Sequence, residues 1–180
     1  MPNKEHGMGH AFMRPIHRIV PDFDVPMIPF FVNCYYGPQP SANRCYRLGK
    51  ATREVIEASP LDLRVAVLGS GGLWHTPGSP KAWLNTAFDE KTLSFIPSGD
   101  GKGMADHFDA AGAKPPEDYA EFPRWVDGGT GMYTGIGGGT GETRNWIAAA
   151  GVADGKKGTV VDYVPVWSSP CGMGFAYWDM

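Results

Sequence analysis

The chain has 180 residues, 42% hydrophobic and 19% charged, so it can bury a core and is too apolar for a disordered protein. Its formal net charge is −3 and its 16 Lys and Arg residues are scattered, which argues against nucleic-acid binding. No apolar run approaches the roughly 20 residues that span a bilayer, and no apolar signal core follows Met1. We therefore predict a single domain over residues 1–180 and a soluble, cytoplasmic protein.

The first half of the chain predicts strand, helix and strand. Residues 1–24 have no clear period and are expected to be extended or looped. The apolar run at 27–36 predicts a buried strand, and the run at 63–69 predicts a second one. Ser41 and Asn43 are both candidate caps of the helix that lies between the two strands. This order implies a parallel crossover, so we expect an α/β fold with a partly parallel mixed sheet and helices packed on its faces.

The second half is less regular. A short helix is predicted from Ser79 to about Phe88, and residues 95–141 are expected to form a long irregular or partly helical loop or insertion. Thr140 is a candidate cap for a helix over ETRNWIAAAG, and residues 159–164 predict a third strand. Three cysteines without a CxxC pair predict reduced thiols rather than a disulfide framework or a zinc site.

The sequence SGGLWH, residues 70–75, follows the second predicted strand directly. In open α/β sheets ligands bind at the loops that follow the carboxyl ends of strands, so His75 lies where a ligand is expected. An imidazole can accept and return a proton near neutral pH. The bare sequence is equally consistent with a histidine that is only hydrogen-bonded within its loop.

Four stretches together resemble one enzyme family: EHGMGHAFMRP, the segment from FFVNCYY to SGGLWH, TGETRNWIAAAG, and VDYVPVWSSPCGMGFAYW. They are similar to the catalytic (beta) subunit of class III extradiol dioxygenases of the protocatechuate 4,5-dioxygenase type. The resemblance implies an oxidoreductase of aromatic compound catabolism that cleaves a catechol ring, such as protocatechuate or gallate, beside its diol. The implied reactant is O₂ and the implied cofactor is non-haem Fe(II).

The same resemblance assigns roles to four residues. It implies that His75 is the acid–base histidine, that His6 assists it, that Glu142 is the carboxylate ligand of a two-histidine, one-carboxylate iron site, and that Ser169 contacts the substrate. Without the resemblance, Glu142 is explained by the helix dipole and Ser169 by an ordinary turn.

Other polar residues have no assigned role. Arg144 and Asn145 are suited either to an anionic ring substituent or to a neighbouring loop. His10, His17 and His107 are expected to be structural or exposed.

The resemblance further implies that both iron-binding histidines precede the segment that corresponds to EHG. The chain is therefore expected to be the C-terminal portion of the catalytic domain, incomplete relative to the family and inactive alone. A missing segment or another polypeptide would then supply the two histidine ligands.

Two other readings remain open. The glycine run GIGGGTGE precedes a helix and could cradle a nucleotide phosphate, although no lysine follows it. Alternatively, the chain is a non-catalytic or degenerate subunit that binds a partner polypeptide through an aromatic face. The residues expected in that face are Phe122, Trp125, Tyr133 and Trp178.

Overall fold

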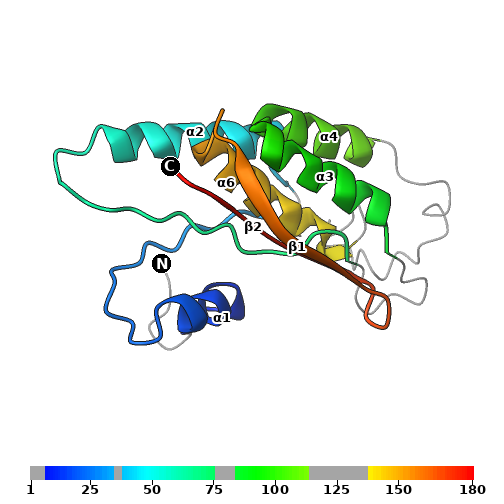
Figure 1. Cartoon of the computed structure of the whole chain (residues 1–180), viewed down its shortest axis with the longest axis horizontal. Helices are drawn as coiled ribbons and strands as arrows, with labels where there is room; N and C mark the ends of the chain where they lie inside the picture. Colours follow the sequence, from blue (N-terminus) through cyan, green and yellow to red (C-terminus); the bar gives the residue numbers. More distant parts are fainter. Residues whose placement is uncertain (1–6, 35–37, 76–83, 114–137) are drawn as a thin grey trace. The chain divides into compact units, whose positions relative to one another are not determined.

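The computed structural model describes residues 7–34, 38–75, 84–113 and 138–180. Within these ranges the fold is mixed α/β, with five α-helices, one 3-10 helix and a two-stranded antiparallel sheet (Figure 1). The chain forms two compact units, Met1–Phe31 and Val32–Met180. None of the described helices has the length and apolar character needed to cross a bilayer.

The first unit contains helix α1, His10–Ile19. The expectation of extended or looped structure over residues 1–24 is therefore wrong for this stretch. Phe12, Ile16 and Ile19 recur at spacings of four and three, which is the helical period. The glycines and prolines around these residues hid that period in the sequence.

The second unit begins with the helix that the sequence predicted, α2, Ala42–Glu57. The Ser41 hydroxyl caps it by accepting a hydrogen bond from the Arg44 amide at 3.2 Å. The Asp109 carboxylate accepts a second one from the Ala42 amide at 2.7 Å. These two bonds satisfy amides that have no partner within the helix.

Helices α3, Thr86–Ser98, and α4, Gly101–Ala113, follow. The short helix predicted to end at Phe88 instead starts beside it, because Asn85 supplies the cap. The predicted start at Ser79 lies outside the described residues. Of the stretch 95–141, expected to be irregular or partly helical, the part up to Ala113 is mostly helical.

A β-hairpin closes the chain. Strand β1, Gly158–Val166, pairs antiparallel with β2, Cys171–Trp178, with an irregularity between Val160 and Asp162. Strand β1 contains the third predicted strand, which is confirmed. One face of the hairpin packs on α3 and the core, whereas the other is exposed.

The predicted partly parallel sheet is absent from the described residues, and this expectation is corrected. The described parts of segments 27–36 and 63–69 have no strand pairing. Ile28 is 90% exposed and Leu63 is 63% exposed. A strand that is buried on both faces needs strands paired beside it and other elements covering its faces, and the described chain pairs no strand with either segment. Local composition indicates extended backbone but cannot supply those neighbours.

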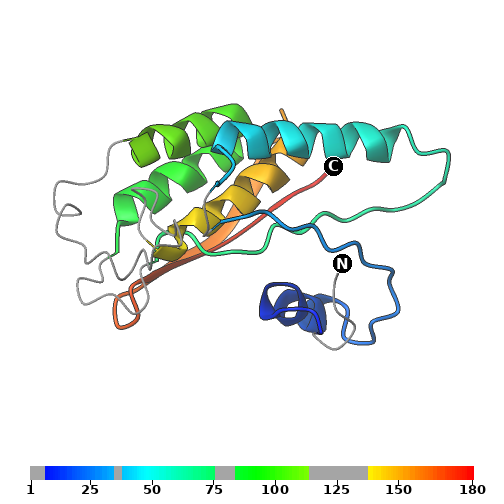
Figure 2. The same ribbon diagram turned by 180° about the vertical axis from the view of Figure 1, so that it is seen from behind.

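The core of the second unit lies between α2, α3, α4, the later helix α6 (Thr143–Val152) and the hairpin. Figures 1 and 2 both show these four helices side by side, with the hairpin along them. The most deeply buried large side chains of this core are Phe108, Leu73, Ile96, Met104 and Ile147. Leu73 belongs to the SGGLWH segment, so this segment is anchored in the core.

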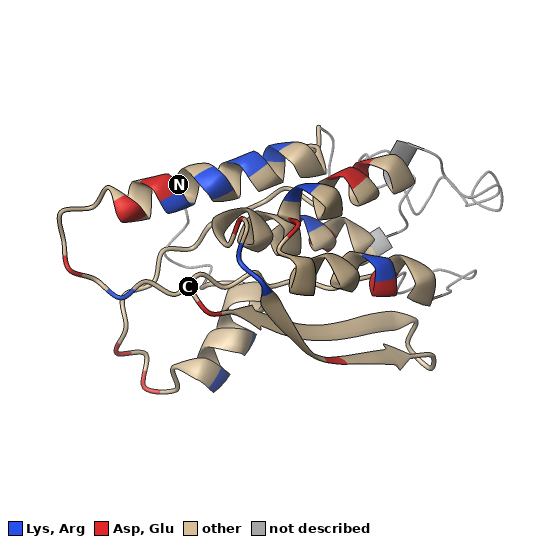
Figure 3. Ribbon diagram, turned by 45° about the horizontal axis from the view of Figure 1, so that its top comes forward, with Lys and Arg blue, Asp and Glu red and all other residues tan. Residues whose placement is uncertain are grey.

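Lys and Arg residues recur along α2, as the colouring in Figure 3 shows. Two of them form ion pairs: Lys50 with Asp154 at 2.9 Å and Arg53 with Glu57 at 2.6 Å. Exposed pairs of this kind contribute at most about 1 kcal/mol each. They mark a solvated helix face rather than a ligand site.

Glycines allow α2 and α6 to approach closely. A Cβ at Gly49 would overlap the backbone carbonyl of Ala148, and one at Gly151 would overlap that of Tyr46. Because both obstacles are backbone atoms, no side-chain rotation relieves the overlap. The two helices can pack at this distance only with glycine at the contact.

We expect Gly49→Ala to lower the free energy of unfolding of the full chain by about 1–3 kcal/mol, because the helices must separate. Urea denaturation followed by circular dichroism measures the change. Ala51→Ser adds one heavy atom at an exposed position of the same helix and is expected to cost less than about 1 kcal/mol. Equal stability of Gly49→Ala and the parent would contradict the close crossing.

Candidate functional site

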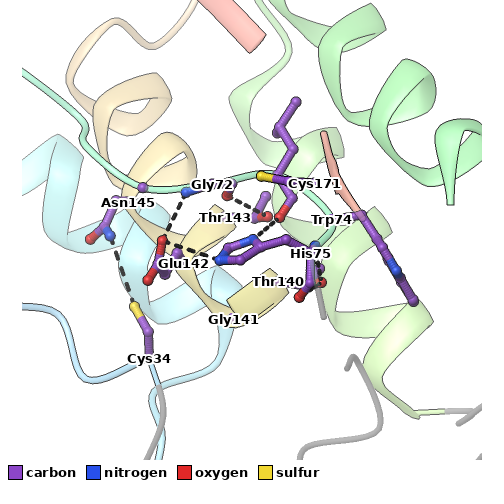
Figure 4. A network of polar contacts seen from close by, with 12 residues as sticks. Cys34, Gly72, Trp74, His75, Thr140, Gly141, Glu142, Thr143, Asn145 and Cys171 are labelled. Carbon is purple, nitrogen blue, oxygen red and sulfur yellow. Dashed lines mark hydrogen bonds and ion pairs between the residues drawn. The ribbon is translucent and has the colours of Figure 1, made fainter. Parts of the chain in front are cut away.

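The loop Gly71–His75 is fastened to the start of α6. The Glu142 carboxylate accepts a hydrogen bond from the Gly72 amide at 2.9 Å. The Trp146 indole donates to the Gly71 carbonyl at 2.9 Å, and the Thr143 hydroxyl contacts the Gly72 carbonyl at 3.4 Å. Figure 4 shows the loop lying over the first turn of the helix. These contacts join segments about 70 positions apart in the chain.

The imidazole of His75 has a defined orientation. Its Nδ1 lies 2.8 Å from the Leu73 carbonyl oxygen, which can only accept, so Nδ1 carries the hydrogen. Its Nε2 faces the Glu142 carboxylate, with 3.7 Å between Nε2 and Oε2 (Figure 4). The backbone amide of His75 donates to the Thr140 hydroxyl at 3.1 Å. His75 and Glu142, to which the resemblance gives roles in one site, therefore lie beside each other, with Nε2 as the ring nitrogen that faces the carboxylate.

Glycines enclose this imidazole. A Cβ at Gly139 would overlap His75 Nε2, and one at Gly72 would overlap Cε1 and Nδ1 of the same ring. A Cβ at Gly141 would overlap the Cys34 carbonyl oxygen. Close packing therefore accounts for two glycines of the run that also suggested a phosphate cradle. These glycines belong to the 3-10 helix η2, Gly138–Glu142. Thr140, the predicted cap of α6, also lies within η2, and the cap position is occupied by Glu142 instead.

A buried carboxylate behind the loop was not anticipated from the sequence. Asp89 is fully buried in α3, and its carboxylate accepts hydrogen bonds from the Trp74 amide and the Tyr163 hydroxyl, both at 2.7 Å. Burial raises the pKa of Asp89 to about 6. An aspartate in the first turn of a helix is ordinarily explained by the helix dipole, so no local signal distinguished this one.

Arg144 contacts a neighbouring loop, which was one of its two expected uses. Its guanidinium donates to the carbonyls of Pro40 at 2.7 Å and Gly141 at 3.2 Å, and it is almost fully buried. Asn145 donates to the Cys34 sulfur at 3.9 Å. Both side chains therefore connect the first turn of α6 to the backbone and side chains of neighbouring segments.

The thiols are free, as predicted. Burial raises the pKa of Cys34 to about 11, so this thiol is protonated at neutral pH. It lies within 3.3 Å of the Val32 carbonyl. A protonated, hydrogen-bonded thiol is a packing element here rather than a nucleophile.

The other predicted residues are Ser169, His6 and the aromatic face of the alternative function. Ser169 lies in the exposed turn between β1 and β2, where its amide donates to the Val166 carbonyl at 3.4 Å. His6 lies outside the described residues, as do Phe122, Trp125 and Tyr133. Trp178 is partly buried against the core.

The other histidines occupy two helices. His10 is the first residue of α1, and His17 stacks on Phe23 with 6.2 Å between ring centroids. His107 stacks on Phe88 at 5.0 Å, and burial lowers its pKa. The described ranges contain no group of three or more His, Cys, Asp or Glu side chains that could hold a metal ion.

We expect Gly139→Ala to displace the His75 ring, since the added methyl group would occupy the position of Nε2. The ring proton and nitrogen signals of His75, assigned with His75→Gln, should shift in the NMR spectrum of ¹⁵N-histidine-labelled protein. Thr140→Ser keeps the hydroxyl that accepts from the His75 amide and should leave those signals in place. Unchanged signals in folded Gly139→Ala would show that the ring does not pack on this glycine.

Comparison with known proteins gives the family to which the chain is similar. A family model described as the catalytic LigB subunit of aromatic ring-opening dioxygenase matches residues 2–171. Gallate dioxygenase from Pseudomonas putida is 36% identical over 97 residues, which cover 52% of this chain and 28% of that protein.

Two further relatives are 2,3-dihydroxyphenylpropionate/2,3-dihydroxicinnamic acid 1,2-dioxygenases. The one from Photorhabdus laumondii is 37% identical over 73 residues, 40% of this chain and 22% of that protein. The one from Mycobacterium ulcerans is 39% identical over 72 residues, 39% of this chain and 22% of that protein. The matched part of the chain thus spans less than a third of the length of these relatives. Because the family model matches nearly the whole sequence, the chain belongs to the family of catalytic LigB subunits of aromatic ring-opening dioxygenases.

Proposed function

We propose that this chain carries the proton-transfer half of a site for extradiol cleavage of a catechol-type ring by O₂ at non-haem Fe(II). The single observation that carries the proposal is the pairing of His75 Nε2 with the Glu142 carboxylate at 3.7 Å. Family membership supplies the reaction class. The relatives act on gallate and on 2,3-dihydroxyphenylpropionate by name, so a phenolic diol bearing a carboxylate is the substrate class we propose.

The residues present fit part of an iron site. A carboxylate beside an imidazole matches the one acidic ligand of a two-histidine, one-carboxylate set, and we assign that ligand to Glu142. The described residues lack a third donor nearby. In our proposal the two histidine ligands therefore come from outside the described residues, from a further segment or another polypeptide. Bound Fe(II) would supply the position where the diol and O₂ meet.

His75 is the proposed acid and base. Its Nδ1 is committed to the Leu73 carbonyl, so proton exchange falls to Nε2. In the reaction a catechol loses a proton on binding, and an oxygen atom gains one as the ring opens. Nε2 accepts the first proton and returns the second, which is a role that imidazole fills near neutral pH.

Two further residues complete the proposal. His6 would assist by positioning or protonating an oxygen of the substrate or of O₂. Ser169, in the exposed turn two residues before Cys171, would contact the substrate. A β-bridge between Cys171 and His75 connects that turn to the loop of the proposed base.

Substitution of His75 tests the proposal. The full gene product is loaded with Fe(II) under anaerobic conditions and then supplied with air. We expect it to consume O₂ and to form a ring-opened product from protocatechuate, gallate or 2,3-dihydroxyphenylpropionate. His75→Gln should lower kcat by about 10²–10⁴-fold while iron content stays unchanged, since general acid–base catalysis contributes a factor of this size. Glu142→Gln should lower iron content instead.

The control is His17→Gln, which removes an imidazole from α1 and should change neither quantity. Undiminished turnover in His75→Gln would remove His75 from its role. Unchanged iron content in Glu142→Gln would remove Glu142 from the ligand set.

A second candidate function is favoured by the exposed face of the hairpin. The apolar side chains of Met173, Phe175 and Tyr177 alternate along β2 and are each 45% to 52% exposed. Contiguous apolar surface of this kind is typical of protein–protein contacts. The chain would then be a non-catalytic subunit on the same scaffold.

This second candidate predicts that the purified chain binds no Fe(II) and associates in a concentration-dependent manner in sedimentation velocity. Phe175→Lys should abolish the association. The matched control, Val55→Lys, adds the same charge at an apolar residue of α2 that is 73% exposed. Iron-dependent turnover by a monomer that Phe175→Lys leaves unchanged would contradict this candidate.

A further inference from the structure

We propose that Asp89 is a positioning residue for His75, acting through the single peptide group that joins Leu73 to Trp74. The inference rests on the proposed function only in taking His75 as the proton-transfer group. The contacts themselves are independent of iron and substrate.

The Leu73–Trp74 peptide group is hydrogen-bonded at both ends. Its N–H donates to Asp89 Oδ1 at 2.7 Å, and its C=O accepts from His75 Nδ1 at 2.8 Å. A peptide group is planar and rigid, so fixing the N–H fixes the direction of the carbonyl. Asp89 therefore sets the orientation of the acceptor that holds the imidazole.

The Asp89 carboxylate also strengthens the hydrogen bond between the Leu73 carbonyl and His75 Nδ1, although it contacts neither atom. An N–H that donates to a carboxylate is polarised, and hydrogen bonds in a chain reinforce one another. The Leu73 carbonyl consequently becomes a better acceptor for His75 Nδ1–H. This keeps the hydrogen on Nδ1 and presents Nε2 to Glu142.

Residues of both strands of the hairpin fix the position of the Asp89 carboxylate. Its second oxygen accepts from the Tyr163 hydroxyl of β1 at 2.7 Å. A Cβ at Gly172 of β2 would overlap that oxygen, so glycine is required where the hairpin passes the carboxylate. The Gly172 amide donates to the Trp74 carbonyl at 2.8 Å. Both backbone polar groups of Trp74 are thus bonded to residues outside the loop.

A purely structural role would not require a carboxylate. The Trp74 amide needs an acceptor, because a buried N–H without a hydrogen-bond partner destabilises the fold. A neutral amide side chain would satisfy it with less desolvation than a buried acid. The carboxylate is the group that both accepts from Trp74 and Tyr163 and polarises the peptide strongly.

The test is the tautomer of His75, read from long-range ¹H–¹⁵N spectra of ¹⁵N-histidine-labelled full-length chain at about pH 8.5, where imidazoles are neutral. We expect the parent to show the Nδ1–H form. Asp89→Ala should convert His75 to a mixture with the common Nε2–H form, and Asp89→Asn, which keeps an acceptor but loses the charge, should give a proportion of the Nδ1–H form between those of the parent and Asp89→Ala. Tyr163→Phe is the matched control, because it removes the other partner of Asp89 and leaves the peptide bonded.

A second measurement, made on the parent, keeps the proposal testable if Asp89→Ala does not fold. In the parent, the Trp74 amide should exchange with deuterium at least about 100-fold more slowly than an exposed amide. A folded Asp89→Ala with an unchanged tautomer would overturn the proposal, and so would rapid exchange of the Trp74 amide in the parent. Absence of ring cleavage in the iron-loaded parent would instead count against the proposed function, and the tautomer would still decide the role of Asp89.

Discussion

The hydrogen bond from the Gly72 amide to the Glu142 carboxylate is the constraint on which the rest of the site depends. It fastens the loop that carries His75 to the first turn of α6, and it uses the same carboxylate oxygen that faces His75 Nε2. The two groups therefore cannot be placed independently. Glycine at 72 and 139 follows from this, because the imidazole fills the space that a side chain would occupy.

Features that depend on neighbouring residues were predictable. Helix α2 and its Ser41 cap follow from apolar spacing and from a hydroxyl placed before the first turn, both of which are local. The third strand was recognisable for the same reason. The proximity of His75 and Glu142 came from motif resemblance, which carries long-range information that periodicity does not.

Features that depend on distant partners were not predictable. The apolar segment 63–69 has strand composition, but a strand exists only where another strand bonds to it. The helix predicted to end near Phe88 was wrong at that end, because Asn85 caps a helix that runs on to Ser98. Asp89 looked like an ordinary first-turn acid, since its partners Trp74 and Tyr163 lie 15 and 74 positions away.

The separation between His75 and Glu142 has its own consequence. At 3.7 Å, Nε2 and Oε2 are within ion-pair range but beyond the roughly 2.7–3.2 Å of a hydrogen bond. At a shorter distance the Glu142 carboxylate and the His75 imidazole would form a direct hydrogen bond, and no other molecule could then hydrogen-bond to Nε2. Backbone bonds prevent that collapse, because Gly72 holds the carboxylate and the Leu73 carbonyl holds the ring. The two groups are thereby held within ion-pair range of each other without a direct hydrogen bond between them. In the function that we propose, this separation is what lets a substrate oxygen approach Nε2.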